Sequence, residues 1–268
     1  MTPIRHVDFE PADWGEFADP PAAWSGYADR VLAHNPIAYW RFGEASGSVA
    51  VDQVGNASGT YVGAVALGQP GVLEHDDNGS AGFNGSDTSV DLGSAPLLDG
   101  QSAGTVMFWM KYTAPSVTAD GAVLARWPDP ALSGWMLWVD DRAYYSNRRR
   151  TMSFAMDILE EPLRLEGSTD LITPGSWDFY AVTFESGVAM RLYKNAALDR
   201  QRSLASVSMP VTTAASRIGF TDGTVGHLPA GLDELAVFDT ALTAEQIAAL
   251  YDLGRGVLNL PAAGGREP

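Results

Sequence analysis

Short segments in which apolar and polar residues alternate follow one another along most of this chain, and they limit the fold more than any other feature. The clearest pair, residues 177–184 and 188–193, is joined by Glu185-Ser186-Gly187 and predicts a β-hairpin. Residues 105–112 alternate in the same way. The turns between such segments use glycine and proline, and the 268-residue chain has 28 glycines and 16 prolines. The pattern predicts an antiparallel all-β sandwich.

Further strands are expected wherever the same alternation or a β-prone composition recurs. These are residues 38–42, 59–66, 80–83, 89–92, 122–127, 135–139, 143–146, 151–156 and 217–220. Helical spacing is rare by comparison. Trp24, Tyr27, Val31 and Leu32 predict an amphipathic helix of about three turns, which ends before Pro36.

The stretch 231–254 joins a strand to a short helix and contains an acidic pair. Thr243 and Gln246 form a capping box at the start of that helix, and Gly254 supplies its end. In the strand, Asp233 and Glu234 stand among apolar residues. A buried carboxylate needs donors or a cation. Because successive strand residues alternate in direction, we expect these two side chains to point to opposite faces.

The composition excludes several classes of ligand and chemistry. The net charge is −16 with only 17 Lys and Arg, which argues against nucleic acid and against anionic membranes. The absence of cysteine excludes disulfides and thiolate chemistry. No apolar run is long enough to span a membrane, and residues 1–10 lack the apolar core of a signal peptide. We therefore expect a protein that stays in the cytosol or leaves it by assembly into something larger.

Three parts are expected along the chain: a docking segment at residues 1–35, a β-domain at 36–256 and a tail at 257–268. The first segment has six acids against Arg5 and Arg30, a net charge of 2 − 6 = −4. It also contains the isolated aromatics Trp14 and Phe17. We interpret it as an arm that becomes ordered on a partner, with Trp14 and Phe17 as docking residues. A terminus without a partner is the alternative.

Six ordered motifs resemble the laminin G-like, concanavalin A-like lectin/glucanase jelly-roll family over residues 37–254. They are AYWRFGEASGSVAVDQVGNASGTYVG (38–63), AGFNGSDTSVDLG (81–93), TVMFWMK (105–111), SWDFYAVTFESGVAMRLYKNA (176–196), RIGF (217–220) and GLDELAVFDTALTAEQIAALY (231–251). The resemblance implies two facing antiparallel sheets with the first and last strands adjacent. Similar domains, with a helix before the first strand, are common in bacteriophage minor tail proteins and other virion proteins.

The resemblance also implies a structural calcium ion, because many members of the family bind Ca²⁺ beside the closing strand. Asp52, Asn56 and Asp233 match that pattern, and oxygen ligands suit Ca²⁺. Val54-Gly55 replaces the usual serine-glycine turn, which puts one side-chain ligand in doubt. The alternative is that Asp52 forms a turn and Asp233 pairs with backbone donors.

Catalysis is not expected. Relatives that hydrolyse glycans use alternating acids on one strand, and neither E-x-D-x-x-E nor E-x-D-x-E occurs here. Candidate ligand-binding residues are a basic cluster that follows two tyrosines and a group of tryptophans: Tyr144, Tyr145, Arg148, Arg149, Arg150, Trp127 and Trp135, with Trp138 beside them. The basic cluster could bind an anionic sugar or the acidic face of a neighbouring subunit, and the tryptophans could stack on a pyranose. Alternatively, the basic cluster is a solvated hairpin tip and the tryptophans belong to the core.

The resulting hypothesis is a non-enzymatic virion protein, on a phage tail or head surface, that binds host surface glycans. It would be assembled in the host cytoplasm and act extracellularly. Its N-terminal arm would contact other virion proteins, and the protein would be oligomeric in the assembly, without membrane insertion or nucleic acid. A structural decoration or adaptor protein without sugar binding is the alternative. A glycoside hydrolase of the same fold is a third hypothesis.

Overall fold

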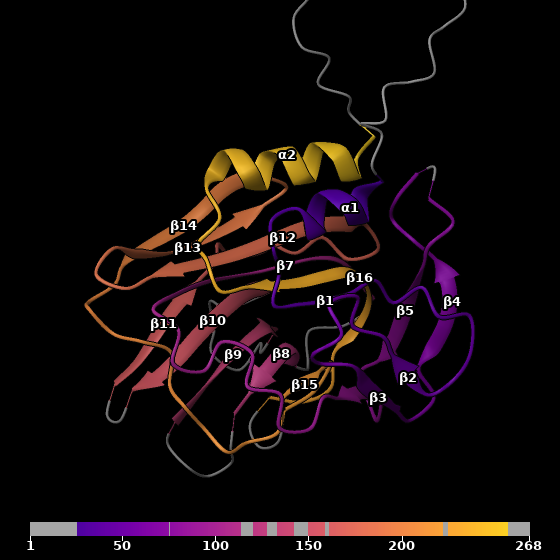
Figure 1. Cartoon of the computed structure of the whole chain (residues 1–268), viewed down its shortest axis with the longest axis horizontal. Coiled ribbons are helices and arrows are strands. Elements are labelled where there is room, and N and C mark those ends of the chain that lie inside the picture. Colours follow the sequence, from indigo (N-terminus) through magenta and orange to yellow (C-terminus); the bar gives the residue numbers. More distant parts are fainter. Residues whose placement is uncertain are drawn as a thin grey trace, which may run out of the picture.

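The computed structural model of the chain describes residues 26–74, 76–113, 120–127, 133–141, 150–158, 161–221 and 225–256. These residues form two antiparallel sheets that face each other, with two helices lying on the outside of one sheet (Figure 1). This is the all-β sandwich that the strand pattern predicts. None of the described helices is long and apolar enough to cross a membrane.

The sheet beneath the helices, sheet A, is built around the long strands β7 and β16. In spatial order its strands are β14 (Ala197–Ser203), β13 (Ala189–Lys194), β12 (Trp177–Glu185), β7 (Ala103–Tyr112), β16 (Pro229–Phe238), β5 (Gly79–Asn84) and β4 (Ala66–Pro70), and β1 (Ala38–Trp40) also pairs with β16. The β1–β16 pairing confirms that the first and last parts of the domain are adjacent, with Tyr39 opposite Ala236.

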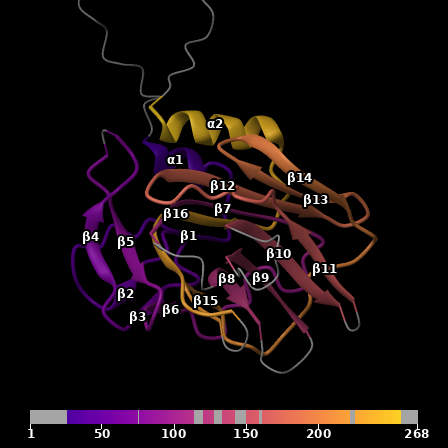
Figure 2. The ribbon, with the colours of Figure 1, turned by 180° about the vertical axis from the view of Figure 1, so that it is seen from behind.

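The facing sheet, sheet B, has eight strands as well. In spatial order they are β11 (Glu161–Glu166), β10 (Thr151–Ile158), β9 (Ser133–Asp140), β8 (Gly121–Arg126), β15 (Arg217–Ile218), β6 (Ser89–Asp91), β3 (Gly59–Val62) and β2 (Val49–Ala50). The sheets meet at one side of the sandwich, where β11 lies beside β14 in both views (Figures 1 and 2).

Strand β7 is buried on both faces, and this explains why its residues 106–110 are all apolar. Phe108 and Met110 point into the core between the sheets, whereas Met107 and Trp109 pack under the helices. The helices are α1 (Tyr27–Leu32) and α2 (Ala244–Gly254), and they cover the outer face of sheet A (Figure 2). The capping box of α2 is confirmed: Gln246 N donates to the Thr243 hydroxyl, and Thr243 N donates to the Gln246 side chain.

The structure differs from the sequence prediction mainly in short polar elements. Helix α1 has six residues, shorter than the predicted three turns. Strands β2, β4, β11 and β14 were not predicted, and the predicted strand at 143–146 lies outside the described residues. The missed strand β14 has mostly exposed residues. Pairing with β13 makes it a strand, and its own sequence has no buried face that would produce alternation.

Candidate functional site

A break in the pairing of β16 gathers the acidic pair into one cluster. On one edge of this strand, β5 pairs as far as Leu232 and β1 pairs from Leu235 onward. Between them the register against β7 shifts, and Glu234 has a left-handed backbone with φ 54°. Such a bulge redirects a side chain. The Asn78 amide donates to Asp233 Oδ1 at 3.3 Å and to Glu234 Oε1 at 3.4 Å, so the prediction that the carboxylates point to opposite faces is wrong.

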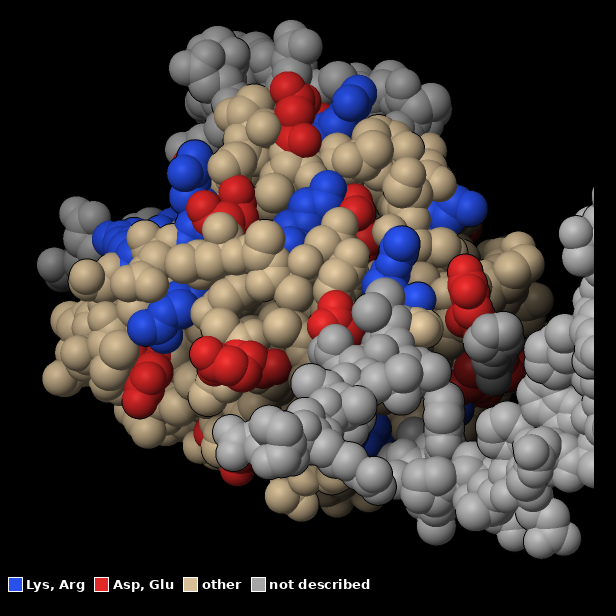
Figure 3. All heavy atoms as spheres, turned by 90° about the horizontal axis from the view of Figure 1, so that it is seen from above, with Lys and Arg blue, Asp and Glu red and all other residues tan. Residues whose placement is uncertain are grey.

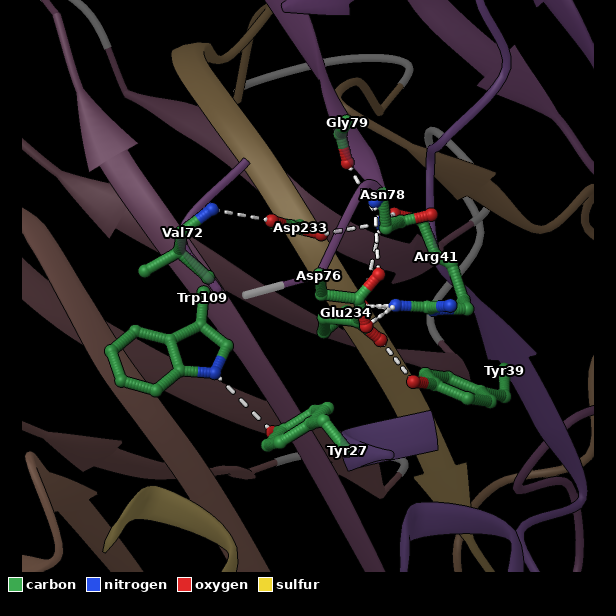
Figure 4. A network of polar contacts seen from close by, with 10 residues as sticks. All are labelled: Tyr27, Tyr39, Arg41, Val72, Asp76, Asn78, Gly79, Trp109, Asp233 and Glu234. Atoms are coloured by element: carbon green, nitrogen blue, oxygen red, sulfur yellow. Dashed lines mark hydrogen bonds and ion pairs between the residues drawn. The ribbon is translucent and has the colours of Figure 1, made fainter. Parts of the chain in front are cut away.

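Glu234 is held by an arginine and a tyrosine from the start of the domain (Figure 4). Arg41 donates to Glu234 Oε1 from Nε at 2.9 Å and from Nη2 at 2.8 Å. The same Nη2 also donates to Asp76 Oδ2 at 2.7 Å. The Tyr39 hydroxyl donates to Glu234 Oε2. Because Glu234 is fully buried, these donors satisfy a carboxylate that water does not reach.

Asp233 is fully buried as well and uses different donors. Val72 N donates to its Oδ2 at 2.8 Å, and the Asn78 amide reaches its Oδ1 (Figure 4). The expectation that the acidic pair needs partners is therefore confirmed. The partners Tyr39, Arg41 and Asn78 were not predicted, because nothing in their local sequence distinguishes them from other polar residues near a strand end.

Burial dominates the electrostatics of this cluster. Burial raises the pKa of Asp233 well above its usual value, and the neighbouring Glu234 charge raises it further. Burial also raises the pKa of Glu234, although Arg41 and Tyr39 act in the opposite direction. Arg41 forms ion pairs with Glu234 and Asp76, and its charge also acts on Asp233. Because one guanidinium serves three carboxyl groups, the cluster favours a bound proton. The buried pair ties β16 to β1 and to residues 72–78, and a substrate cannot reach it.

The predicted calcium ligands do not form one shell in this structure. Four backbone N–H groups donate to Asp52: those of Tyr39 and Val54 to Oδ1, at 2.7 and 3.0 Å, and those of Asn56 and Ala57 to Oδ2, both at 2.8 Å. Tyr39 O accepts from Gln53 N, so this loop lies along the edge of β1 that faces away from β16 and Asp233. No group of three or more His, Asp or Glu residues suited to a metal occurs in the described part of the chain. Calcium binding stays a prediction.

The tryptophans predicted to form a sugar-stacking platform lie on two different faces of sheet B. Trp135 is fully buried in the core between the sheets and therefore cannot stack on a ligand, which corrects that prediction. The alternation of β9 turns Trp138 to the outer face, where half-buried Trp127 packs against the same cluster. Arg150 N donates to Asp141 Oδ1 at 3.3 Å. The remaining predicted residues lie outside the described residues: Tyr144, Tyr145, Arg148, Arg149, Trp14 and Phe17.

A continuous row of side chains crosses the outer face of sheet B. Cross-strand pairing gives the order Thr60, Asp91, Arg217, Ala125, Met136, Ala155 and Arg164. Near one end of the row the Arg164 guanidinium lies 4.6 Å from the ring centroid of Trp138, and Arg164 also pairs with Asp140. The middle of this row is buried, with Ala125, Met136 and Ala155 at 1%, 8% and 3% exposure, so a ligand can reach only its ends, at Thr60 and Asp91 and at Arg164.

An open hollow lies at the other end of the row, at β3 and β6. It has a volume of about 490 Å³ and is lined by Ser58, Thr60, Val62, Asp91, Leu92 and Gly93. Asp91 Oδ1 accepts from Gly93 N at 2.8 Å, which orients the carboxylate. The sequence prediction missed these residues. The only sequence signal for them is a weak alternation in β3, where Thr60 and Val62 are exposed and Tyr61 between them lies in the core.

The two facing antiparallel sheets define a concanavalin A-like jelly-roll sandwich. A family model described as Concanavalin A-like lectin/glucanases superfamily, of the laminin G type, matches residues 84–248. The chain belongs to this family, as the resemblance of its motifs implied. None of the curated proteins matches the sequence.

Solved structures of similar fold include toxin and glycosidase domains. A botulinum neurotoxin serotype D ligand-binding domain in complex with N-acetylneuraminic acid has a TM-score of 0.60 and 16% identity, covering 83% of this chain and 52% of that one. Domain 4 of AbnA, an extracellular arabinanase from Geobacillus stearothermophilus in complex with arabinotriose, has a TM-score of 0.58 and 19% identity, covering 80% and 97%. The chain thus spans about half of the toxin chain. At these identities the likeness shows the fold alone.

Proposed function

We propose that this protein is a non-enzymatic carbohydrate-binding protein and that the hollow at β3 and β6 takes a sugar unit. The observation that carries the proposal is the mixed lining of this hollow. Thr60 and Asp91 offer a hydroxyl and a carboxylate, and Val62, which is 43% exposed, offers apolar surface beside them. A sugar ring needs both kinds of contact, because its hydroxyls require hydrogen-bond partners and its C–H groups pack on apolar surface.

Asp91 is the residue expected to orient the ligand. Gly93 N already donates to Oδ1, so the carboxylate is held in place before a ligand arrives. Oδ2 can then accept a hydrogen bond from a sugar hydroxyl, and a charged acceptor makes that bond stronger than a neutral one. Two of the similar structures are complexes with sugars, arabinotriose and N-acetylneuraminic acid, and they support a sugar as the class of ligand.

Binding is favoured over hydrolysis because the hollow has one carboxylate in its lining. A glycosidase needs two carboxyl groups facing each other across the scissile bond. The lining contains Asp91 as its acid, and the paired acids Asp233 and Glu234 are buried on the other sheet. The hollow can therefore bind a sugar, but it lacks the second carboxyl group that glycoside hydrolysis requires as base or nucleophile.

The biological location that we propose for this sugar binding is the one that the resemblance of the sequence motifs implies. We propose display on a virion, with attachment to other virion proteins through residues 1–35 and binding to host surface glycans. A decoration or adaptor protein that binds no sugar is the second candidate. Its support is the acidic, aromatic arm, which a purely glycan-binding role does not explain.

A glycan array probed with the purified full chain tests the proposal, and titration calorimetry of any hit measures its affinity. We expect Asp91→Asn to weaken binding about tenfold or more, as for loss of one charge-assisted hydrogen bond. Thr60→Val, which keeps the side-chain shape, should also weaken it. Asp239→Asn is the matched control because Asp239 is exposed at the end of β16. An array without hits would favour the second candidate, a decoration or adaptor protein that binds no sugar. Release of reducing sugar from a glycan would establish hydrolysis instead.

A further inference from the structure

Exposed valine side chains gather beside the hollow at β3 and β6. Seven large hydrophobic side chains are exposed in the part of the chain that the structure describes, and three of them lie here: Val49 on β2, Val51 just after β2, and Val62 on β3. Val62 also lines the hollow itself. A single exposed valine is ordinary, but a group of them next to a polar site indicates a contact surface for a ligand.

The valines of β2 and β3 share one face of sheet B with the polar lining. Val49 lies opposite Thr60, and Thr60 lies opposite Asp91, so these residues form one row across β2, β3 and β6. Val62 is two residues from Thr60 and therefore points to the same side. The residues between them on the three strands lie in the core between the sheets: Ala50, Tyr61 and Val90. The row and Val62 thus face outward together.

The arrangement places an apolar contact and a charged one on either side of a hydroxyl. Val62 lies opposite Ser89, so Asp91 on β6 is its diagonal neighbour. The Cβ atoms of diagonal neighbours on paired strands are roughly 7 Å apart. A pyranose ring that lies over Thr60 can therefore place hydroxyls at Asp91 and the substituent on its other side against Val62.

The charges around the hollow favour a neutral ligand. Asp91 is the one charged residue in the described lining, and the chain as a whole has a net charge of −16. Arg217 lies opposite Asp91, but it is not among the lining residues, and its guanidinium lies 5.6 Å from the ring centroid of Phe220. On the helix side, by contrast, basic and acidic side chains are interspersed (Figure 3). An acidic sugar would be repelled at the hollow.

We propose that the hollow selects a neutral 6-deoxyhexose, an inference that rests on the proposed sugar binding. The ring hydroxyls bind Asp91 and Thr60, the C6 methyl group packs on Val62, and Val49 extends the apolar surface. An ordinary hexose carries a hydroxyl at C6. Against a valine this hydroxyl loses its hydrogen bonds to water and gains no partner, which costs free energy. An acetamido sugar also carries a methyl group, but its amide N–H and C=O need partners of their own.

Titration of the full chain with free sugars that differ only at C6 tests the proposal. The pairs are L-fucose with L-galactose and L-rhamnose with L-mannose, and the amide NMR signals of residues 58–62 and 91–93 report binding at the hollow. In at least one pair we expect the deoxy sugar to bind about fivefold tighter. Val62→Thr keeps the shape of the side chain and should remove this preference. Val188→Thr is the matched control, because Val188 in the β12–β13 turn is 45% exposed and Val62 is 43% exposed.

Asp91→Asn separates this inference from the proposed function. It should weaken both sugars of a pair by the same factor, because it removes a contact to hydroxyls that the two sugars share. No binding of any sugar would refute the proposed function and this inference with it. Equal binding of both sugars in each pair, or a preference that survives Val62→Thr, would refute the inference alone. Tighter binding of N-acetylneuraminic acid or N-acetylglucosamine than of either deoxy sugar would assign the hollow to another class of sugar.

Discussion

Replacing Arg41 by methionine should destabilise the protein strongly at neutral pH, because Arg41 is the cation that compensates buried Glu234. The variant loses two hydrogen bonds to Glu234 and one to Asp76. Breaking a buried pair from one side costs about 3–5 kcal/mol. The Arg41 side chain is 19% exposed, so we expect the lower end of that range, about 3 kcal/mol. For a domain of this size that lowers Tm by about 6–12 °C.

The loss should depend on pH, and its sign follows from the pKa of Glu234. Burial raises this pKa, and Arg41 acts to lower it. Removing Arg41 therefore raises it further. A carboxyl group with a raised folded-state pKa contributes stability that is fully present below its unfolded-state pKa and is lost as pH rises through the folded-state pKa. The deficit of Arg41→Met relative to wild type should thus be small near pH 4.5 and largest above pH 7, where Glu234 would otherwise be charged.

Urea unfolding between pH 4.5 and pH 8 measures this difference. Adding Glu234→Gln to Arg41→Met should recover much of the loss at pH 8, because it removes the charge that Arg41 compensated. Arg30→Met, at an exposed position on α1, should stay within about 0.5 kcal/mol of wild type. The same deficit at every pH, without recovery by Glu234→Gln, would refute the electrostatic reasoning and leave lost packing as the cause.

Three further predictions concern the turn, the helix and the cap. Asp52→Ala leaves four backbone N–H groups without their acceptor and should cost about 1–3 kcal/mol in urea unfolding. The same variant tests the calcium prediction: a calcium-dependent rise in the Tm of wild type that Asp52→Ala abolishes would establish the site, and an unchanged Tm would leave Asp52 as a turn residue. Gly254→Ala would put a Cβ 2.6 Å from Trp109 and 3.1 Å from Tyr27. It should therefore lower the free energy of unfolding by about 1–3 kcal/mol and change the near-ultraviolet circular dichroism of these aromatic rings. An unchanged spectrum and Tm would contradict this close contact. Thr243→Ala removes the capping box and should cost about 1 kcal/mol, with Thr213→Ala as an exposed control.

The strand pattern predicted the sandwich because most strands have at least one buried face. The hairpin strands β12 and β13 and the doubly buried β7 are rich in apolar residues, and the capping box of α2 is local in sequence. Strand β14 was missed because its side chains are mostly exposed and the pairing with β13 creates it. Local sequence thus predicts elements with a buried face and fails where long-range pairing alone forms a strand.

The candidate sites were predictable in part for the same reason. That Asp233 and Glu234 need partners follows from their place in an apolar strand. The direction of Glu234 depends on a bulge at the junction between β5 and β1, which appears only when the three strands pair. The hollow at Thr60 and Asp91 depends in turn on which strands become neighbours in sheet B. Spacing within one segment does not contain this information.

The two outer faces of the sandwich differ in what a ligand would have to displace. On sheet A, α1 and α2 bury Tyr27, Val31, Ile247 and Leu250 against Trp109 and its neighbours. Exposing side chains of this kind costs about 1.5–3 kcal/mol each, so a glycan cannot reach that face without a large loss. The hollow on sheet B requires only the removal of water. The described chain also starts and ends on the helix side, where Gly254 lies against Tyr27. A partner attached at either point would therefore leave the hollow at Thr60 and Asp91 accessible to a glycan.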